Sequence, residues 1–183
     1  IEQFEDVISH KDFGTLIHNT LESMYKNIGK LHETKLQSFK KKSNDLLKST
    51  FDKVYAKGSY QKGENRIQLE IAKAYLAKFF DKEIHNLKTS QTEILSIEES
   101  VSSTFETSQH KVMLKGKIDR VDEYDGDLRI IDLKTGKVEG KNLKFDDFED
   151  LISDYDYSKA FQILFYALLY QEKHQAKNIK AGI

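Results

Sequence analysis

Three residues in the second half of the chain have the side-chain types needed for metal-assisted chemistry on phosphate: Asp119, Asp132 and Lys134. Carboxylate oxygens are the hard ligands that Mg²⁺ prefers, and one or two of them suffice when a substrate phosphate completes the coordination. A metal held by both aspartates can polarise a phosphoryl oxygen and lower the pKa of a bound water. The lysine can orient that water or neutralise the charge that forms around phosphorus.

A β-hairpin is predicted to bring these residues together. Asp125-Gly126 lies between two alternating, β-branched runs and is the strongest short-range signal for a hairpin turn. If these two residues form a type I′ turn, Asp119 directly faces Asp132, and Asp122 faces Arg129 on the other side of the ladder. The opposed aspartates would repel each other unless a cation lay between them, so the register favours a metal site. The alternative is an exposed hairpin whose polar face simply meets water.

Composition narrows the classes of protein to which the chain can belong. The length of 183 residues suits one domain with a helical elaboration, and the start at Ile1 indicates a piece of a longer polypeptide. The absence of cysteine excludes disulfides, thiolate zinc sites and an Fe–S cluster with cysteine ligands, and is compatible with a cytoplasmic protein. No apolar run is long enough to span a membrane, so no membrane partner is expected.

Charge is unevenly distributed along the chain. From Lys30 to Lys62 there are nine lysines and three acidic residues, whereas from Lys117 to Asp156 there are thirteen acidic and seven basic residues. A basic segment beside an acidic, metal-binding one favours a substrate that carries phosphate. A lysine run can also be no more than the solvated face of a helix.

The apolar pattern predicts helices first and a sheet afterwards. Asp12 is the expected N-cap of a first helix, a second helix covers much of Leu31–Ala56 before a break at Lys57-Gly58, and a third covers Glu64–Leu87. Five residues are expected to form the buried stripe of the third helix: Ile67, Ile71, Ala74, Tyr75 and Phe79.

Beyond Thr89 the pattern changes to that of strands. The segments Thr92–Ile97 and Val101–Thr107 favour β-structure and precede the hairpin. A short helix is expected near Phe145–Ile152, a strongly apolar helix capped by Ser158 follows, and Asn178–Ile183 begins another strand. The order indicates an α/β fold with a mixed, mostly antiparallel sheet flanked by helices and a helical N-terminal portion. We expect one domain over 1–183, with 1–88 helical and 89–183 forming the core.

Three short motifs carry a resemblance to a known family. They are G-x-I-D-R-x-D at Gly116–Asp122, I-D-x-K-T-G at Ile131–Gly136 and Q-x-x-x-Y at Gln162–Tyr166. In this order the motifs resemble the RecB-like branch of the PD-(D/E)XK nucleases, which includes the nuclease domains of the RecB and AddA/AddB recombination enzymes. The resemblance implies a restriction-endonuclease-like core.

The same resemblance implies roles for particular residues. Asp119 and Asp132 would ligate the catalytic metal together with the backbone carbonyl of Leu133, and Lys134 would be the catalytic lysine. Gln162, Tyr166 and Arg120 would contact DNA or support the active site; Gln162 and Tyr166, four positions apart on a helix, would project together. A polar pair at the rim of a core helix is the alternative reading of Gln162 and Tyr166.

A histidine ligand and one further acid belong to the same comparison. The family places a histidine on an N-terminal helix in a G-x-x-x-H setting, which Gly14 and His18 match. His18 is therefore expected to be a metal ligand, although a lone helical histidine is more often structural. Glu98 resembles an acidic position that the family often carries, but it is not predicted to be a ligand.

The function implied by the resemblance is that of a metal-dependent DNA nuclease, an exonuclease of DNA repair or recombination. Its cofactor would be Mg²⁺, for which Mn²⁺ would substitute. Its partners would be DNA and an ATP-dependent helicase domain or subunit, and no Walker-type loop for ATP occurs in the chain itself. Two rival interpretations stay open: a catalytically silent nuclease-like module that binds DNA or scaffolds a helicase complex, and a helical interaction domain with an incidental polar hairpin.

Overall fold

The fold is known from a computed structural model that describes residues 7–55 and 59–183. The chain divides into two compact units, Ile1–Gln91 and Thr92–Ile183. Among the helices of the described residues, none combines the length and apolar character required to cross a membrane. The break predicted at Lys57-Gly58 lies outside the described residues.

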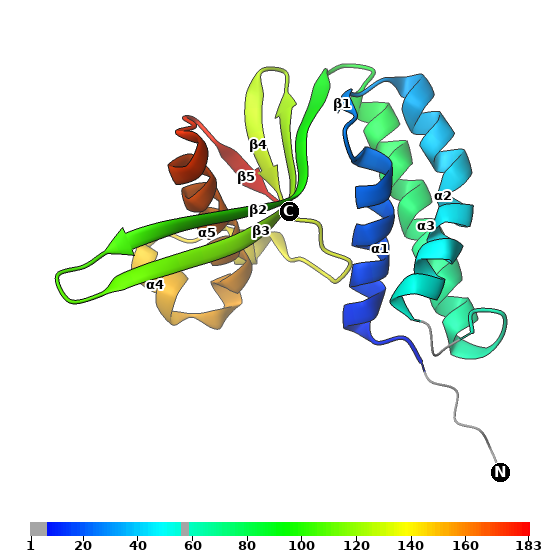
Figure 1. The fold of residues 1–183 in the computed structure, drawn as a ribbon, viewed down its shortest axis with the longest axis horizontal. Coiled ribbons are helices and arrows are strands. Elements are labelled where there is room, and N and C mark those ends of the chain that lie inside the picture. The colour runs from blue at the N-terminus through cyan, green and yellow to red at the C-terminus, as the bar shows by residue number, and fades with distance from the viewer. Residues whose placement is uncertain (1–6, 56–58) are drawn as a thin grey trace, which may run out of the picture. The chain divides into compact units, whose positions relative to one another are not determined.

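The first unit is a bundle of three helices, α1 (His10–Tyr25), α2 (Glu33–Val54) and α3 (Gly63–Asn86), with a two-residue strand β1 (Gly29–Lys30) after α1. The helices lie side by side in Figure 1. Aromatic rings fill one end of the bundle: Tyr25 stacks on Phe80 with ring centroids 6.3 Å apart and meets the edge of Phe39 at 5.7 Å. Packing of these rings holds the three helices together.

Two predictions about helix starts are wrong. Ser9, not Asp12, is the N-cap of α1: the Asp12 amide donates to Ser9 Oγ at 3.1 Å, and Ser9 Oγ donates to Asp12 Oδ2 at 2.8 Å. This reciprocal pair resembles a capping box, in which the acid belongs to the first turn rather than the cap. Ser158 is already the first residue of its helix, and Tyr157 stands at the cap.

The predicted buried stripe of α3 is also wrong. Ile67, Ile71 and Tyr75 are 60%, 38% and 45% exposed, and the buried apolar residues are instead Leu69, Ala72, Leu76 and Phe80. The helix carries two apolar lines, and each of them has helical spacing. Periodicity alone does not say which line meets the neighbouring helices.

The second unit contains a sheet whose strands are neighbours in the order β2 (Thr92–Glu106), β3 (Lys111–Tyr124), β4 (Asp127–Ile131) and β5 (Lys180–Gly182). The pairs β2–β3 and β3–β4 are antiparallel, and β5 lies parallel to β4. Between β4 and β5 the chain forms η1 (Gly140–Leu143), α4 (Phe148–Ser153), η2 (Tyr155–Tyr157) and α5 (Ser158–His174). The predicted α/β fold, with N-terminal helices and a mixed, mostly antiparallel sheet, is confirmed.

The core of the second unit lies between this sheet and α5. Six buried residues form it: Val101, Ile118, Val121, Ile130, Leu169 and Tyr170. The two segments predicted as separate strands, Thr92–Ile97 and Val101–Thr107, join into the single strand β2. The register of β2 against β3 shifts between Ile94 and Ser96, which marks a bulge in the strand.

Candidate functional site

The predicted hairpin register is confirmed from Tyr124↔Asp127 to Arg120↔Ile131. Asp125 and Gly126 have φ values of +50° and +88°, the two positive values that a type I′ turn requires. Strand β4 ends at Ile131, so the ladder stops one pair before Asp119 and Asp132. The prediction that these two aspartates face each other as a ladder pair is therefore wrong.

The ladder stops because Asp119 binds the backbone that would have continued it. The amide of Leu133 donates to Asp119 Oδ2 at 2.6 Å, and the amide of Asp132 donates to the Gly182 carbonyl of β5 at 3.0 Å. The segment after β4 thus separates from the neighbouring strand β3 at Asp132, where the Asp119 side chain and β5 hold its backbone. This arrangement places Asp132 directly after the last paired residue of β4, next to the peptide that Asp119 holds.

The acid that faces Asp119 comes from β2 instead. The pairs Ile97↔Arg120 and Glu99↔Ile118 flank Glu98 and Asp119, so these two residues lie opposite each other. Each offers a carboxylate oxygen within 4.8 Å of the other. Two carboxylates at this distance repel each other, and a bound cation removes that cost. Lys117 Nζ lies 2.6 Å from Glu98 Oε2 and supplies part of the compensation.

Glu98 holds an unusual backbone conformation for a residue within a strand. Its φ is +53°, in the left-handed region, and its side chain is only 10% exposed. A non-glycine residue there costs on the order of 1–2 kcal/mol, and such strain gathers at functional sites. The sequence motif points to an acid at Glu98 but does not predict it to be a ligand. Only the register of β2 against β3 brings it opposite Asp119, and the turn between these strands has no motif from which that register could be predicted.

A polar chain connects the segment after β4 to helix α5. Lys134 Nζ lies 2.7 Å from Asp132 Oδ2 and donates to Gln162 Oε1 at 3.0 Å, while Gln162 Nε2 donates to the Tyr166 hydroxyl at 2.8 Å. The expectation that Gln162 and Tyr166 project together is met, because both belong to this chain of contacts. The lysine ammonium is thereby held at one aspartate and oriented by α5.

A glycine fixes how closely α5 approaches the sheet. A Cβ atom added at Gly116 would lie 2.9 Å from Tyr166 Cε1 and 3.3 Å from Leu169 Cδ1. These distances are shorter than ordinary van der Waals contacts, so Gly116 has to lack a side chain for Tyr166 to pack on β3. The first glycine of the G-x-I-D-R-x-D motif therefore positions Tyr166.

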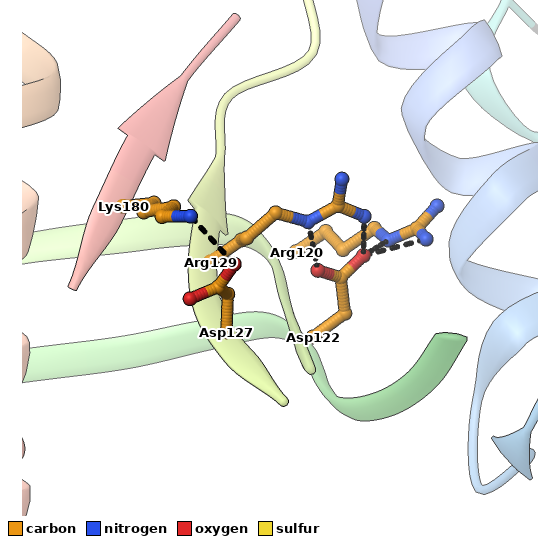
Figure 2. A network of polar contacts seen from close by, with 5 residues as sticks. All are labelled: Arg120, Asp122, Asp127, Arg129 and Lys180. Carbon is orange, nitrogen blue, oxygen red and sulfur yellow. Dashed lines mark hydrogen bonds and ion pairs between the residues drawn. The ribbon is translucent and has the colours of Figure 1, made fainter. Parts of the chain in front are cut away.

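Arg120 belongs to a buried ion-pair network rather than to an exposed surface. Figure 2 shows Asp122 between the guanidinium groups of Arg120 and Arg129. Arg120 Nε donates to Asp122 Oδ2 at 2.6 Å, and Arg129 donates to both carboxylate oxygens at 2.8 and 2.9 Å. Asp122 is fully buried and Arg120 is 3% exposed. In this position Arg120 can support the strand that carries Asp119, but it has no surface to offer to DNA.

The C-terminal end of α5 is fastened to β2 beside Glu98. Glu99 Oε1 lies 2.7 Å from both Lys173 Nζ and His174 Nε2, and Ser96 Oγ donates to Glu99 Oε2. Burial raises the pKa of Glu99, but the hydrogen bonds from Lys173, Ser96 and His174 outweigh it and leave this pKa below its usual value. Helix α5 is thus held through Gln162 to the segment after β4, and through Lys173 and His174 to β2.

His18 lies on α1 in the first unit, four positions after Gly14 on the same helix. Its role as a metal ligand stays a prediction, as does that of the Leu133 carbonyl.

The oxygen-rich acids of the second unit fit a divalent cation of the Mg²⁺ or Mn²⁺ kind. Glu98, Asp119 and Asp132 supply only hard carboxylate oxygens, the donors that these ions select. The opposed pair Glu98 and Asp119 is itself an observation in favour of a cation, because two facing carboxylates are otherwise unfavourable. The chain has no cysteine to favour a softer metal.

Comparison with known proteins gives one family. The model of the PD-(D/E)XK nuclease superfamily matches residues 2–183, nearly the whole chain. No curated protein matches the chain. The matched residues include Asp119, Asp132 and Lys134. The chain belongs to the PD-(D/E)XK nuclease superfamily.

Proposed function

We propose that this chain is a metal-dependent deoxyribonuclease domain that hydrolyses phosphodiester bonds, and that it acts as an exonuclease in DNA repair or recombination. Membership of the superfamily implies a nucleic-acid substrate. The observation that carries the proposal is the facing pair Glu98 and Asp119 beside the chain of contacts that begins at Asp132 and Lys134. Hard ligands and a held ammonium are together what phosphoryl chemistry needs.

Three carboxylates of the second unit are proposed to hold the cation: Glu98, Asp119 and Asp132. The sequence motif adds His18 and the Leu133 carbonyl to this proposed set. When bound, Mg²⁺ or Mn²⁺ supplies Lewis-acid polarisation of the phosphoryl oxygen and makes water more acidic. The 2.6 Å hydrogen bond from the Leu133 amide fixes one oxygen of Asp119. It therefore orients this carboxylate before any substrate arrives.

Hydrolysis forms a bond from a water oxygen to phosphorus and breaks the bond from phosphorus to the leaving oxygen. One water proton ends on the leaving oxygen and the other is released, which yields a phosphate monoester and an alcohol. Charge grows on the phosphoryl oxygens during attack, and the Lys134 ammonium can stabilise it. Asp132 and Gln162 hold that ammonium at 2.7 and 3.0 Å, so its position is set in advance.

The RecB-like assignment and a helicase partner are finer parts of the same proposal. They are supported by the order G-x-I-D-R-x-D, I-D-x-K-T-G and Q-x-x-x-Y along the chain. The lysine-rich helix α2 is also proposed to contact phosphates. Such contacts would be independent of sequence and weakened by salt.

Cleavage of end-labelled linear DNA in Mg²⁺ or Mn²⁺ tests the function. We expect cleavage by the wild-type chain and its loss in Asp132→Ala and Lys134→Ala, whereas Lys137→Ala retains it. Lys137 is a suitable control because it is an exposed lysine in the same loop that pairs with Glu139, outside the site. Resistance of closed circular DNA would support the exonuclease assignment.

The opposite results would overturn the proposal in two distinguishable ways. Cleavage that survives both substitutions would show that another protein or another site is responsible. Absence of cleavage, with salt-sensitive DNA binding retained, would identify a silent nuclease-like module instead.

A further inference from the structure

The outer halves of β2 and β3 form a two-stranded ribbon that no other strand of the second unit covers. Strand β4 pairs only with Arg120–Tyr124, so β3 from Lys111 to Asp119 has β2 as its one partner strand. Figure 1 shows this ribbon reaching past β4 and β5. The ribbon begins at the carboxylate pair of Glu98 and Asp119 and ends at the β2–β3 turn.

The two faces of the ribbon differ sharply in character. One face packs toward α5 through Val101, Gly116 and Ile118. The other, which we call the exposed ribbon face, consists of eight exposed residues at alternate positions of the two strands: Ser100, Ser102, Thr104, Glu106, Lys111, Met113, Lys115 and Lys117. Cross-strand pairing confirms that they share a face, since Ser100 pairs with Lys117, Ser102 with Lys115 and Thr104 with Met113.

The net charge of this face is positive, and its lysines are exposed. Two acids of the ribbon pair with its lysines: Glu98 lies 2.6 Å from Lys117, and Glu106 lies 2.8 Å from Lys111. Both side chains of that pair are about 70% exposed, so water screens their attraction and a phosphate can compete for Lys111. Hydroxyl groups from β2 stand beside the lysines and are common donors to phosphate oxygens.

The residues of this face on β3 form a row that leads to the candidate site. Lys111, Met113, Lys115 and Lys117 occupy every second position of β3, and the next position in this row is Asp119. Alternate residues of a strand are roughly 6.7 Å apart. This is close to the separation of successive phosphates in an extended nucleic-acid strand, so consecutive cations can meet consecutive phosphates.

We propose that the exposed ribbon face binds the sugar-phosphate backbone of a single nucleic-acid strand and leads it to Glu98 and Asp119. The inference rests on the proposed function, to which it adds the surface that receives the substrate. The lysines neutralise phosphates, and the serine and threonine hydroxyls donate to them.

Met113 is the observation that favours a single strand over a duplex. Its side chain is 61% exposed and stands between Lys111 and Lys115 in the row. An apolar side chain among phosphate-binding cations gains from contact with an unpaired base, whose face is accessible only outside a duplex.

Binding of a fluorescent oligothymidylate to the whole chain in EDTA tests the ribbon without cleavage. In the double variant Lys111→Ala/Lys115→Ala we expect weaker binding, and a slope of log affinity against log salt that is less steep by about 0.7 for each lysine removed. Lys177→Ala is the matched control, because it removes an exposed lysine of the same unit that belongs to neither strand of the ribbon but to the segment between α5 and β5. A double variant with the wild-type slope would overturn the proposal.

Met113→Ser separates base contact from phosphate contact. We expect affinity for the oligothymidylate to fall roughly three- to tenfold, as when part of the apolar area of a methionine stays in water, with the salt slope unchanged. Duplex DNA of equal length that competes as well as the single strand would overturn the choice of occupant.

Failure of the ribbon and failure of the nuclease function give different results. Hydrolysis of a small diester such as bis(p-nitrophenyl) phosphate, with oligothymidylate binding indifferent to the ribbon substitutions, would overturn the ribbon alone. Ribbon-dependent binding without hydrolysis of any diester would overturn the nuclease function and support the binding surface.

Discussion

Asp119 and Asp122 lie three residues apart on the same strand and in the same motif, yet their surroundings are opposite. Asp122 is fully buried between two guanidinium groups, so its charge is compensated on both oxygens. Asp119 faces another carboxylate, that of Glu98, and has the Leu133 amide on one oxygen. An odd separation along a strand puts the two side chains on opposite faces. One motif thus supplies one acid to the fold and one to the chemistry.

The comparison teaches how to distinguish a structural acid from a chemical one. Buried charges in a stable protein are normally paired, and Asp122 obeys that rule. Asp119 and Glu98 differ from Asp122 because their like charges face each other, even with Lys117 2.6 Å from Glu98, and because Glu98 sits on a strained backbone. Facing carboxylates and a strained backbone cost folding free energy, and such a cost is typical of a ligand-binding site.

The largest effect is expected on stability at Asp122. Asp122→Ala leaves Arg120 with a buried charge that has lost its acid, and breaking a buried pair in this way costs about 3–5 kcal/mol. For a chain of this size the Tm should fall by roughly 6–20 °C. Asp127→Ala is the control, since Asp127 makes an exposed pair with Lys180 at 2.5 Å (Figure 2) that is worth less than about 1 kcal/mol. Equal losses of Tm in the two variants would show that Asp122 contributes no more to stability than the exposed Asp127.

Substitution of Asp119 is expected to lower activity rather than stability. Asp119→Asn keeps an oxygen for the Leu133 amide but removes the charge. Cleavage should therefore fall by more than about 100-fold, which is more than the loss expected when a residue that only orients a metal ligand is replaced. The metal-free Tm should hold steady or rise because repulsion from Glu98 disappears. The rise in Tm that Mg²⁺ gives to the wild type should vanish. A drop in metal-free Tm as large as that of Asp122→Ala would make Asp119 a structural acid.

Gly116→Ala should affect both properties together. The added Cβ would push Tyr166 off β3, at a cost of about 1–3 kcal/mol, and would disturb Gln162 and therefore Lys134. Thermal unfolding and cleavage should both decline, whereas Gly140→Ala, where a Cβ would meet nothing within 4 Å, should leave both unchanged. Unaltered cleavage in Gly116→Ala would separate Tyr166 from catalysis.

The smallest and most selective effect is expected at Glu98. Glu98→Gly relieves the positive φ and should stabilise the metal-free protein by up to about 1 kcal/mol while lowering cleavage. Glu98→Gln retains the strained backbone, so it should lower cleavage without that gain. Chemical unfolding without metal measures the difference, and a destabilised Glu98→Gly variant would contradict the idea that strain is stored there.

The hairpin was predictable because local chemistry determines it. Asp125-Gly126 specifies the turn, and period-two alternation then fixes every pair from Tyr124↔Asp127 to Arg120↔Ile131. Ion pairing of Asp122 with Arg129 followed from the same register. The predicted ladder was one pair too long. The Leu133 amide, which a longer ladder would have used, donates instead to the Asp119 side chain.

The errors concern choices that local sequence leaves open. Helix α3 has two apolar lines, and tertiary packing selected Leu69 and Leu76 over Ile67 and Tyr75. The proximity of Glu98 to Asp119 depends on the pairing of β2 with β3 and on a bulge near Ile94, neither of which has a turn motif to announce it. His18 depends on tertiary placement too, and sequence could offer only its motif.

The one-sided pairing of the outer half of β3 has a consequence for amide hydrogen exchange. Residues Arg120–Tyr124 have neighbours on both sides, β2 and β4, so their region should open only when the whole unit unfolds. Residues Lys111–Lys117 have one neighbouring strand and should exchange through small local openings. The ribbon can therefore adjust its shape residue by residue, while the segment that anchors Asp119 keeps its place.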